Sequence, residues 1–207
     1  IKTFDDLVGY YRTTPQFLSL RLPTQKSYDY CIDRAVRTFL SPKVTFGRTN
    51  LGKIGVSECK KAYQQWLNRG IRTANMTATV SSVLFNTAVE LELIPNNPMK
   101  HVTKMQTQPR KVMWTEDQVR LFLDTAYGEY KWRSIGLIVH MAYSFAQRIG
   151  DMRTLEWSNI NFEERRLDLE QSKKRAEVHL PIHIHMYRML EHRDPTSPAS
   201  HPRPHRD

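Results

Sequence analysis

The sequence has few cysteines and no long apolar segment, and both absences narrow the possible classes of protein. Cys31 and Cys59 are the only cysteines among 207 residues. Their spacing fits no metal-ligand motif, so we expect two reduced thiols packed on helices in a cytoplasmic protein. A transmembrane helix needs roughly 18 consecutive apolar residues, but the longest apolar stretch covers only residues 136–142. Residues 1–11 are acidic and aromatic, which is not the pattern of a signal peptide.

An excess of acidic residues is also absent, and the basic excess is concentrated in the first half. The formal net charge is +10. Residues 1–109 hold 15 basic and 7 acidic residues, whereas residues 110–207 hold 16 and 14. A basic domain favours a polyanionic partner, most often nucleic acid. The first residue is not Met, from which we expect that the reading frame begins further upstream.

Apolar residues recur at helical spacing through the first hundred residues. The predicted helices are one capped by Thr3, one after Pro23 with Thr24 as N-cap and Phe39 on its apolar face, one from Ser57 to Arg69 with Gly70 as C-cap, and one from about Thr73 that Pro95 ends. Short connections join them. We therefore expect a compact all-α domain over residues 1–98.

The second half begins after a linker predicted at residues 99–112. Residues 113–191 are expected to form another domain, in which Thr115 caps a helix and a largely buried helix covers residues 131–144. A short helix follows at residues 151–155. Alternating apolar residues at 166–170 and 177–182 predict a β-hairpin, and the Pro- and His-rich residues 192–207 predict a disordered tail. The expected fold class is mainly α with a small β-hairpin.

The segment from Ala142 to Ile182, AYSFAQRIGDMRTLEWSNINFEERRLDLEQSKKRAEVHLPI, resembles the first conserved box of the tyrosine recombinases, the phage integrase family. The matching features are Arg148 after a buried helix, Asp151, the Leu155-Glu156-Trp157 run, Lys173 in the hairpin turn and the exit Leu180-Pro181. Tyr28 and the run LELIPNNPMKHV resemble the family's core-binding domain. The resemblance implies a helical, SAM-like core-binding domain followed by an incomplete α+β catalytic domain.

By this resemblance the chemistry is phosphoryl transfer on duplex DNA through a phosphotyrosine. Arg148 is implied to hold the scissile phosphate, because a guanidinium forks onto two phosphate oxygens. Lys173 is implied to be the general acid for the leaving oxygen, with Lys174 as the alternative. Asp151 either orients Arg148 or caps its helix. The plainer interpretations are a surface arginine and a solvated basic hairpin.

Other parts of the family pattern are not found. The family's second His-x-x-Arg box and nucleophilic tyrosine are expected well after the hairpin. The run from His185 to Arg188 spells such a box but comes too early, and nothing in the sequence positions Tyr187 as a nucleophile. We therefore expect a truncated recombinase that is unable to cleave alone. No cofactor is expected, and no metal site is expected because the histidines have no Cys or acidic partners at ligand spacing.

The resemblance also implies a clamp around double-stranded DNA. Candidate DNA-binding residues are Lys26, Arg34, Arg72, Thr73, Asn75, Thr77, Lys104, Arg110 and Lys111. A homo-oligomer on DNA is possible, while no membrane and no small-molecule substrate are expected, and the place of action would be the bacterial cytoplasm. The alternative functions are a non-enzymatic prophage remnant that occupies recombination sites, and a basic helical interaction module without a DNA role. Salt-dependent duplex binding separates both DNA-binding hypotheses from the last one.

Overall fold

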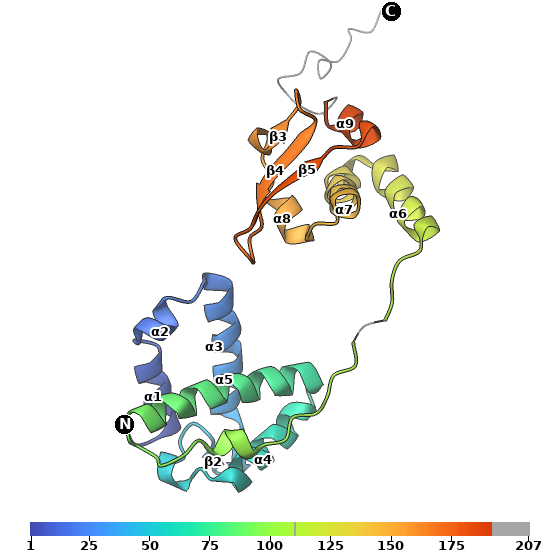
Figure 1. Cartoon of the computed structure of the whole chain (residues 1–207). Coiled ribbons are helices and arrows are strands. Elements are labelled where there is room, and N and C mark those ends of the chain that lie inside the picture. Colours follow the sequence, from blue (N-terminus) through green and yellow to red (C-terminus); the bar gives the residue numbers. More distant parts are fainter. Residues whose placement is uncertain (110, 192–207) are drawn as a thin grey trace, which may run out of the picture. The chain divides into compact units, whose positions relative to one another are not determined.

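The computed structural model describes residues 1–109 and 111–191, which divide into two compact units, Ile1–Arg110 and Lys111–Asp207 (Figure 1). The predicted tail, residues 192–207, and Arg110 lie outside the described residues. Within residues 1–109 and 111–191, no helix combines the length and the apolar character that crossing a bilayer requires. Each unit has its own hydrophobic core.

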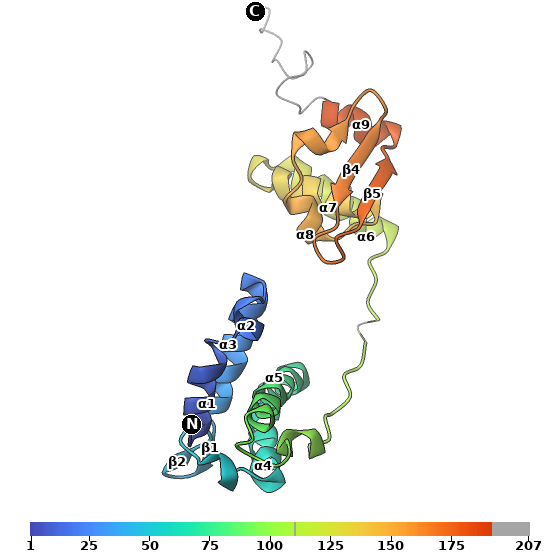
Figure 2. The ribbon, with the colours of Figure 1, turned by 60° about the vertical axis from the view of Figure 1, so that its left-hand side comes forward.

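The first unit is built from helices joined by short connections (Figure 2). Its elements are α1 (Phe4–Tyr11), α2 (Pro15–Leu18), α3 (Leu22–Arg37), β1 (Phe39–Ser41), β2 (Val44–Thr45), η1 (Leu51–Lys53), α4 (Val56–Leu67), α5 (Ile71–Glu90) and η2 (Pro98–His101). The predicted cap of α1 is confirmed: Thr3 accepts from the Asp6 N–H, and the Asp6 side chain accepts from the Thr3 N–H. The long helix α5 packs against α3, α4 and α1.

Both predicted boundaries of helix α3 are wrong. Helix α3 begins at Leu22 with Arg21 as its N-cap, so Thr24 lies inside its first turns. Pro23 fits there because the first turn of a helix does not need the missing N–H. The helix ends at Arg37, and Phe39 lies in strand β1 with 57% of its surface exposed instead of on a buried helical face.

The boundaries at both ends of α5 also differ from the predicted ones. Gly70 is the N-cap of α5 rather than the C-cap of α4, whose C-cap is Asn68. The backbone of Gly70 has a φ of 99°, a conformation that residues with a Cβ rarely adopt. Helix α5 ends at Glu90, before Pro95, because Glu92 adopts a left-handed φ of 55°.

Part of the segment predicted as a linker belongs to the first unit. Met99 and Val102 are 2% and 7% exposed and join its core. The following residues are tied to the same unit, since the Met105 N–H donates to the Tyr63 hydroxyl (2.8 Å) and the Met105 carbonyl accepts from Asn75 (2.7 Å). The first unit therefore holds the chain as far as residue 105.

The second unit places helices around a three-stranded antiparallel sheet. Its elements are α6 (Glu116–Gly128), η3 (Tyr130–Trp132), α7 (Arg133–Phe145), α8 (Ile149–Arg153), η4 (Trp157–Asn159), β3 (Ile160–Asn161), β4 (Arg166–Glu170), β5 (Glu177–Pro181) and α9 (Ile184–Glu191). The Thr115 cap is confirmed by its reciprocal hydrogen bonds with Gln118. The hairpin is confirmed as β4 and β5, with Leu167 opposite Leu180, and the additional short strand β3 completes the order β3-β4-β5.

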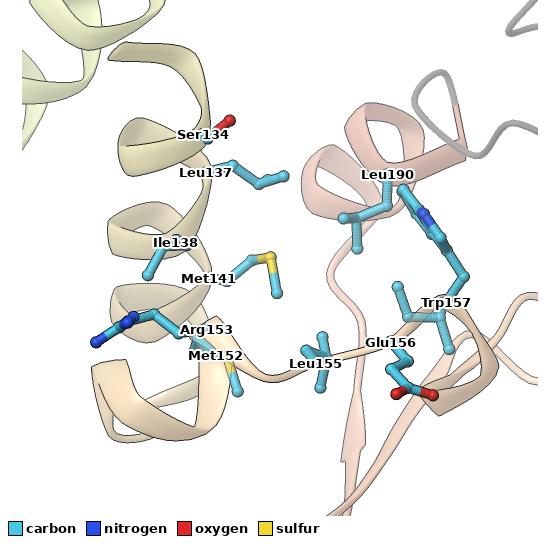
Figure 3. A pocket seen from close by; sticks show the side chains of 11 residues that line it. Ser134, Leu137, Ile138, Met141, Met152, Arg153, Leu155, Glu156, Trp157 and Leu190 are labelled. Carbon is cyan, nitrogen blue, oxygen red and sulfur yellow. The ribbon is translucent and has the colours of Figure 1, made fainter. Parts of the chain in front are cut away.

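Helix α7 is less buried than the sequence predicts. Gly136, Met141 and Phe145 are buried, but Ile135 and Tyr143 are 45% and 59% exposed. Leu137 and Met141 of α7 line an apolar pocket of about 250 Å³, together with Leu190 of α9 (Figure 3). Apolar residues of α7 therefore have two environments. Some share a hydrophobic core with residues of the sheet, and others line a pocket that is open among the described residues.

Candidate active site and DNA-binding residues

Arg148 lies at the start of helix α8, where a tight turn ends helix α7. The turn contains Ala146 in a left-handed conformation with a φ of 50°. Arg148 is the N-cap of α8 with an extended backbone, and its side chain makes no capping hydrogen bond. Its guanidinium side chain is 44% exposed. The cation is therefore held by a rigid junction between two helices and is open to an anionic ligand.

Asp151 connects this junction to the β4–β5 turn. Its side chain is 3% exposed, and its Oδ1 accepts from the backbone N–H of Ser172 at 3.1 Å. Its Oδ2 lies 3.7 Å from Arg148 Nη1, an ion-pair separation that is too long for a hydrogen bond. Hydrogen bonds from the Ser172 side chain and backbone, together with the Arg148 charge, hold the pKa of Asp151 below its ordinary value. Asp151 is thus a charged anchor between Arg148 and the turn.

A second contact joins the same two segments. Gln171 Nε2 donates to Gln147 Oε1 at 2.7 Å, and Gln147 immediately precedes Arg148. The turn itself is closed by the Gln171 N–H, which donates to the Ala176 carbonyl at 2.8 Å. The hairpin turn is therefore fastened to the Arg148 junction at two points, through Gln171 and through Ser172.

Lys173 and Lys174 both lie in this fastened turn and are both exposed. Neither has an ion-pair partner among the described residues, whereas Arg175 Nη1 pairs with Glu170 Oε1 at 3.0 Å. Arg175 also adopts a left-handed φ of 56°. Either lysine could therefore carry a proton to a substrate, and the choice between them stays a prediction.

We expect the Asp151→Asn variant to be less stable at neutral pH by about 1–3 kcal/mol, because a buried acceptor of two hydrogen bonds loses its charge. The folded pKa of Asp151 is lowered, so its contribution is present above the unfolded pKa and is lost as the pH falls through the folded pKa. The gap between wild type and variant should therefore shrink below about pH 4. Urea titrations at pH 7 and pH 3, followed by NMR signals of β4, measure both differences.

The matched control for this prediction is Asp124→Asn, which changes an exposed carboxylate on α6 that has no ion-pair partner among the described residues. It should change the urea midpoint little at either pH. An Asp151→Asn variant as stable as wild type at pH 7, or a gap that does not depend on pH, would show that the carboxylate charge does not anchor the turn.

The predicted DNA-binding residues fall into distinct structural environments. Lys26 on α3, Arg72 on α5 and Lys111 are exposed, and Thr73 is half-buried. Lys104 is exposed, and its ammonium donates to the Thr79 hydroxyl at 2.8 Å. Arg110 lies outside the described residues. Five of the candidates thus have a surface that a polyanion could reach.

Two candidates have internal roles instead. Thr77 is fully buried, and its hydroxyl donates to the Thr73 carbonyl and accepts from Arg34 Nη1 at 3.0 Å. Its prediction as a direct DNA contact is wrong, because its side chain is buried in the first unit and its hydroxyl is already bonded to Arg34. Asn75 accepts from the Tyr63 hydroxyl (2.6 Å) and donates to Met105, so both of its amide groups serve the fold.

Tyr187 is part of the packing of helix α9. Its hydroxyl donates to Glu191 Oε1 at 3.4 Å, and its ring lies 5.8 Å from the ring of Phe162. The guanidinium of Arg165 lies 5.2 Å from the centre of the Tyr187 ring. Through these contacts, Tyr187 packs against residues of its own unit. Among the described residues no group of three or more His, Cys, Asp or Glu side chains could hold a metal ion.

The comparisons with known proteins agree on one group. The sequence profile named Phage_integrase, for the phage integrase family, matches residues 113–197. A protein of Haemophilus influenzae (strain ATCC 51907 / DSM 11121 / KW20 / Rd), whose name describes it as an integrase/recombinase candidate, is 26% identical over 171 residues. That alignment covers 75% of this chain and 47% of the relative, so the chain spans about half the length of the curated relative.

Solved structures share the fold. A lambda integrase dimer bound to a COC′ core site matches with a TM-score of 0.74 at 20% identity, covering 86% of this chain and 48% of that one. A lambda integrase tetramer bound to a Holliday junction matches with a TM-score of 0.75 at 20% identity, covering 89% and 53%. The Tn1549 transposon integrase in complex with circular intermediate DNA matches with a TM-score of 0.71 at 16% identity, covering 94% and 66%.

Proposed function

We propose that this chain, whose residues 113–197 match the phage integrase family, is the DNA-binding and phosphate-engaging part of a site-specific DNA recombinase of the tyrosine recombinase type. The observation that carries the proposal is the double fastening of the β4–β5 turn to the Arg148 junction, through Asp151–Ser172 and Gln147–Gln171. This fastening keeps a strong cation and a lysine-bearing turn at one place in the fold. A phosphodiester needs both kinds of group when it is attacked.

The proposed roles follow from the chemistry of each side chain. Arg148 binds two non-bridging oxygens of the scissile phosphate, since its guanidinium is half-exposed and anchored. Lys173 gives a proton to the departing 5′ oxygen, and Lys174 is the alternative. Asp151 is a positioning residue, because its buried carboxylate holds the turn and faces Arg148 without reaching the surface.

Strand cleavage is proposed only in combination with further groups that the described residues do not supply. The curated relative is about twice as long as the matched part, and the phosphotyrosine step needs a nucleophile and a further His-x-x-Arg box, for which the described residues offer no candidate in a suitable setting. Residues 1–207 alone are therefore proposed to bind DNA without cleaving it, in the bacterial cytoplasm. Oligomers on DNA are proposed by analogy with the lambda integrase dimer and tetramer.

We expect the full chain to bind duplex DNA with a strong dependence on salt. If it neutralises about six phosphates, log affinity should fall with log salt concentration with a slope of about −5. Fluorescence anisotropy of a labelled duplex between about 50 and 200 mM salt measures this slope. Because phosphate contacts carry no sequence information, an unrelated duplex of equal length should give a similar slope.

The double variant Lys26→Ala/Arg72→Ala tests the proposed DNA-binding face, which we define by these two exposed candidates on α3 and α5. The double variant Lys53→Ala/Lys60→Ala removes the same charge from the same unit and is its control. Wild-type binding that does not change with salt, or equal losses in the two double variants, would contradict the proposed DNA-binding face. Absence of duplex binding by the wild type at any salt concentration would instead favour a protein partner.

A further inference from the structure

The first unit contains an arginine-lined hollow, and Arg34 is the one lining residue that belongs to the predicted DNA-binding set. The hollow has a volume of about 520 Å³ and lies where α3 and α4 end. Its lining residues are Tyr30, Asp33, Arg34, Arg37, Thr38, Gln65, Trp66 and Arg69. We name it the arginine pocket, after Arg34, Arg37 and Arg69. A volume of this size is in the range of small-ligand sites.

The charges of the arginine pocket are not neutralised within the protein. Arg37 and Arg69 are exposed and have no ion-pair partner among residues 1–109 and 111–191. The single acidic residue of the lining, Asp33, lies 3.4 Å from the guanidinium of Arg12. Three guanidinium groups around one hollow repel one another, and an anion bound among them would relieve that repulsion.

The floor and walls of the arginine pocket are rigid. Trp66 is 2% exposed, and its Nε1 donates to the Thr38 hydroxyl at 2.7 Å. Thr38 in turn donates to the Arg34 carbonyl at 2.7 Å, while Arg34 Nη1 donates to the buried Thr77 hydroxyl at 3.0 Å. Gln65 donates to the Phe39 carbonyl at 2.6 Å. A ligand would therefore meet a pre-organised floor, and the side chains that it would order on binding are the exposed Arg37 and Arg69.

We propose that the arginine pocket binds a phosphate of the DNA backbone, with Arg37 and Arg69 as direct contacts and Arg34 as an anchored neighbour. This inference rests on the proposed function and deepens it, because it assigns phosphate contacts to two residues outside the candidate set. Guanidinium groups fork onto two phosphate oxygens, and the exposed Tyr30 supplies a further hydroxyl donor at the rim. Free phosphate has the same chemistry as the backbone phosphate and is the other source to be separated by experiment.

The test uses the full chain and fluorescence anisotropy with a labelled duplex at several salt concentrations. The double variant Arg37→Ala/Arg69→Ala is expected to bind about tenfold more weakly or worse, with a salt slope less steep by about 1. Arg37→Lys/Arg69→Lys keeps the charge but loses the forked geometry and should have an intermediate affinity. The control Lys60→Ala/Lys61→Ala removes two exposed cations of α4 that do not line the pocket. Circular dichroism checks that every variant is folded.

The outcomes distinguish a DNA backbone phosphate from free phosphate as the ligand of the arginine pocket. If the arginine double variant loses no more affinity or slope than the lysine control, the arginine pocket is not a phosphate site although DNA binding stands. If wild type binds no duplex at all, the proposed function fails, and calorimetry with inorganic phosphate decides about the pocket alone. Binding of inorganic phosphate that Arg37→Ala/Arg69→Ala abolishes would then assign the pocket to a free anion, and no binding would overturn it.

Discussion

Replacing Arg148 by Ala is expected to lower the rate of covalent protein–DNA adduct formation by about 10²–10³-fold, in a fusion of this chain to a segment that supplies a nucleophilic tyrosine. The reason is that the negative charge on the phosphate becomes more concentrated in the transition state than in the ground state. A half-exposed guanidinium at a rigid helix junction stabilises that charge without rearrangement. Denaturing gel electrophoresis of labelled DNA measures the adduct over time.

Two controls separate this catalytic role from binding and folding. Arg153→Ala removes an exposed arginine from the same short helix α8 and should change the adduct rate little. Arg148→Lys keeps a positive charge but not the fork, so we expect it to recover only part of the rate. Duplex affinity should fall much less than the adduct rate in Arg148→Ala, and an unchanged adduct rate would show that Arg148 does not meet the phosphate.

In the same tyrosine-bearing fusion, replacing Lys173 by Ala is expected to slow strand cleavage by about 10²–10⁴-fold, the usual contribution of a positioned general acid. The effect should depend on the leaving group. A duplex with sulfur in place of the departing 5′ oxygen loses a thiolate, which needs little protonation because thiols have a pKa of about 8.5. Cleavage of this sulfur-substituted duplex by Lys173→Ala should therefore approach the wild-type rate.

Lys174→Ala is the matched control, since both lysines are exposed in the same turn. It should cleave both duplexes at nearly the wild-type rate if Lys173 is the acid. The reverse pattern, with Lys174→Ala slow on oxygen and rescued by sulfur, would assign the proton to Lys174. Slow cleavage that sulfur does not rescue would mean that the turn contributes something other than a proton.

The pairing of Arg148 with the lysine turn also explains why Asp151 is buried rather than presented to substrate. Its carboxylate accepts from Ser172 and faces Arg148 at 3.7 Å, so one charged group restrains two segments. From the sequence, orienting Arg148 and capping its helix were equal alternatives. The structure places Asp151 at an ion-pair separation from Arg148, as the first alternative requires, and adds a hydrogen bond to the hairpin turn, 21 residues further along the chain.

Local features of this protein were determined by the sequence itself. The Thr3 and Thr115 capping boxes and the β4–β5 hairpin depend on residues that are close along the chain, and all three are present. Helix ends set by neighbours were predicted less well. Thr24 is not the N-cap of α3, because Pro23 fits inside the first turn of the helix. Phe39 is not in the helix, because Thr38 takes an extended conformation and accepts a hydrogen bond from Trp66.

The tertiary structure alone decided which polar residues serve the fold and which remain open to a ligand. Thr77 and Arg34 meet across 43 residues, and Gln147 and Gln171 across 24. Apolar periodicity identifies the buried face of a helix but not the partner that lies against its polar edge. For this reason the sequence pointed to Arg148 and Lys173 through their flanking motif, whereas Arg37 and Arg69 stood out only after α3 and α4 had packed around one hollow.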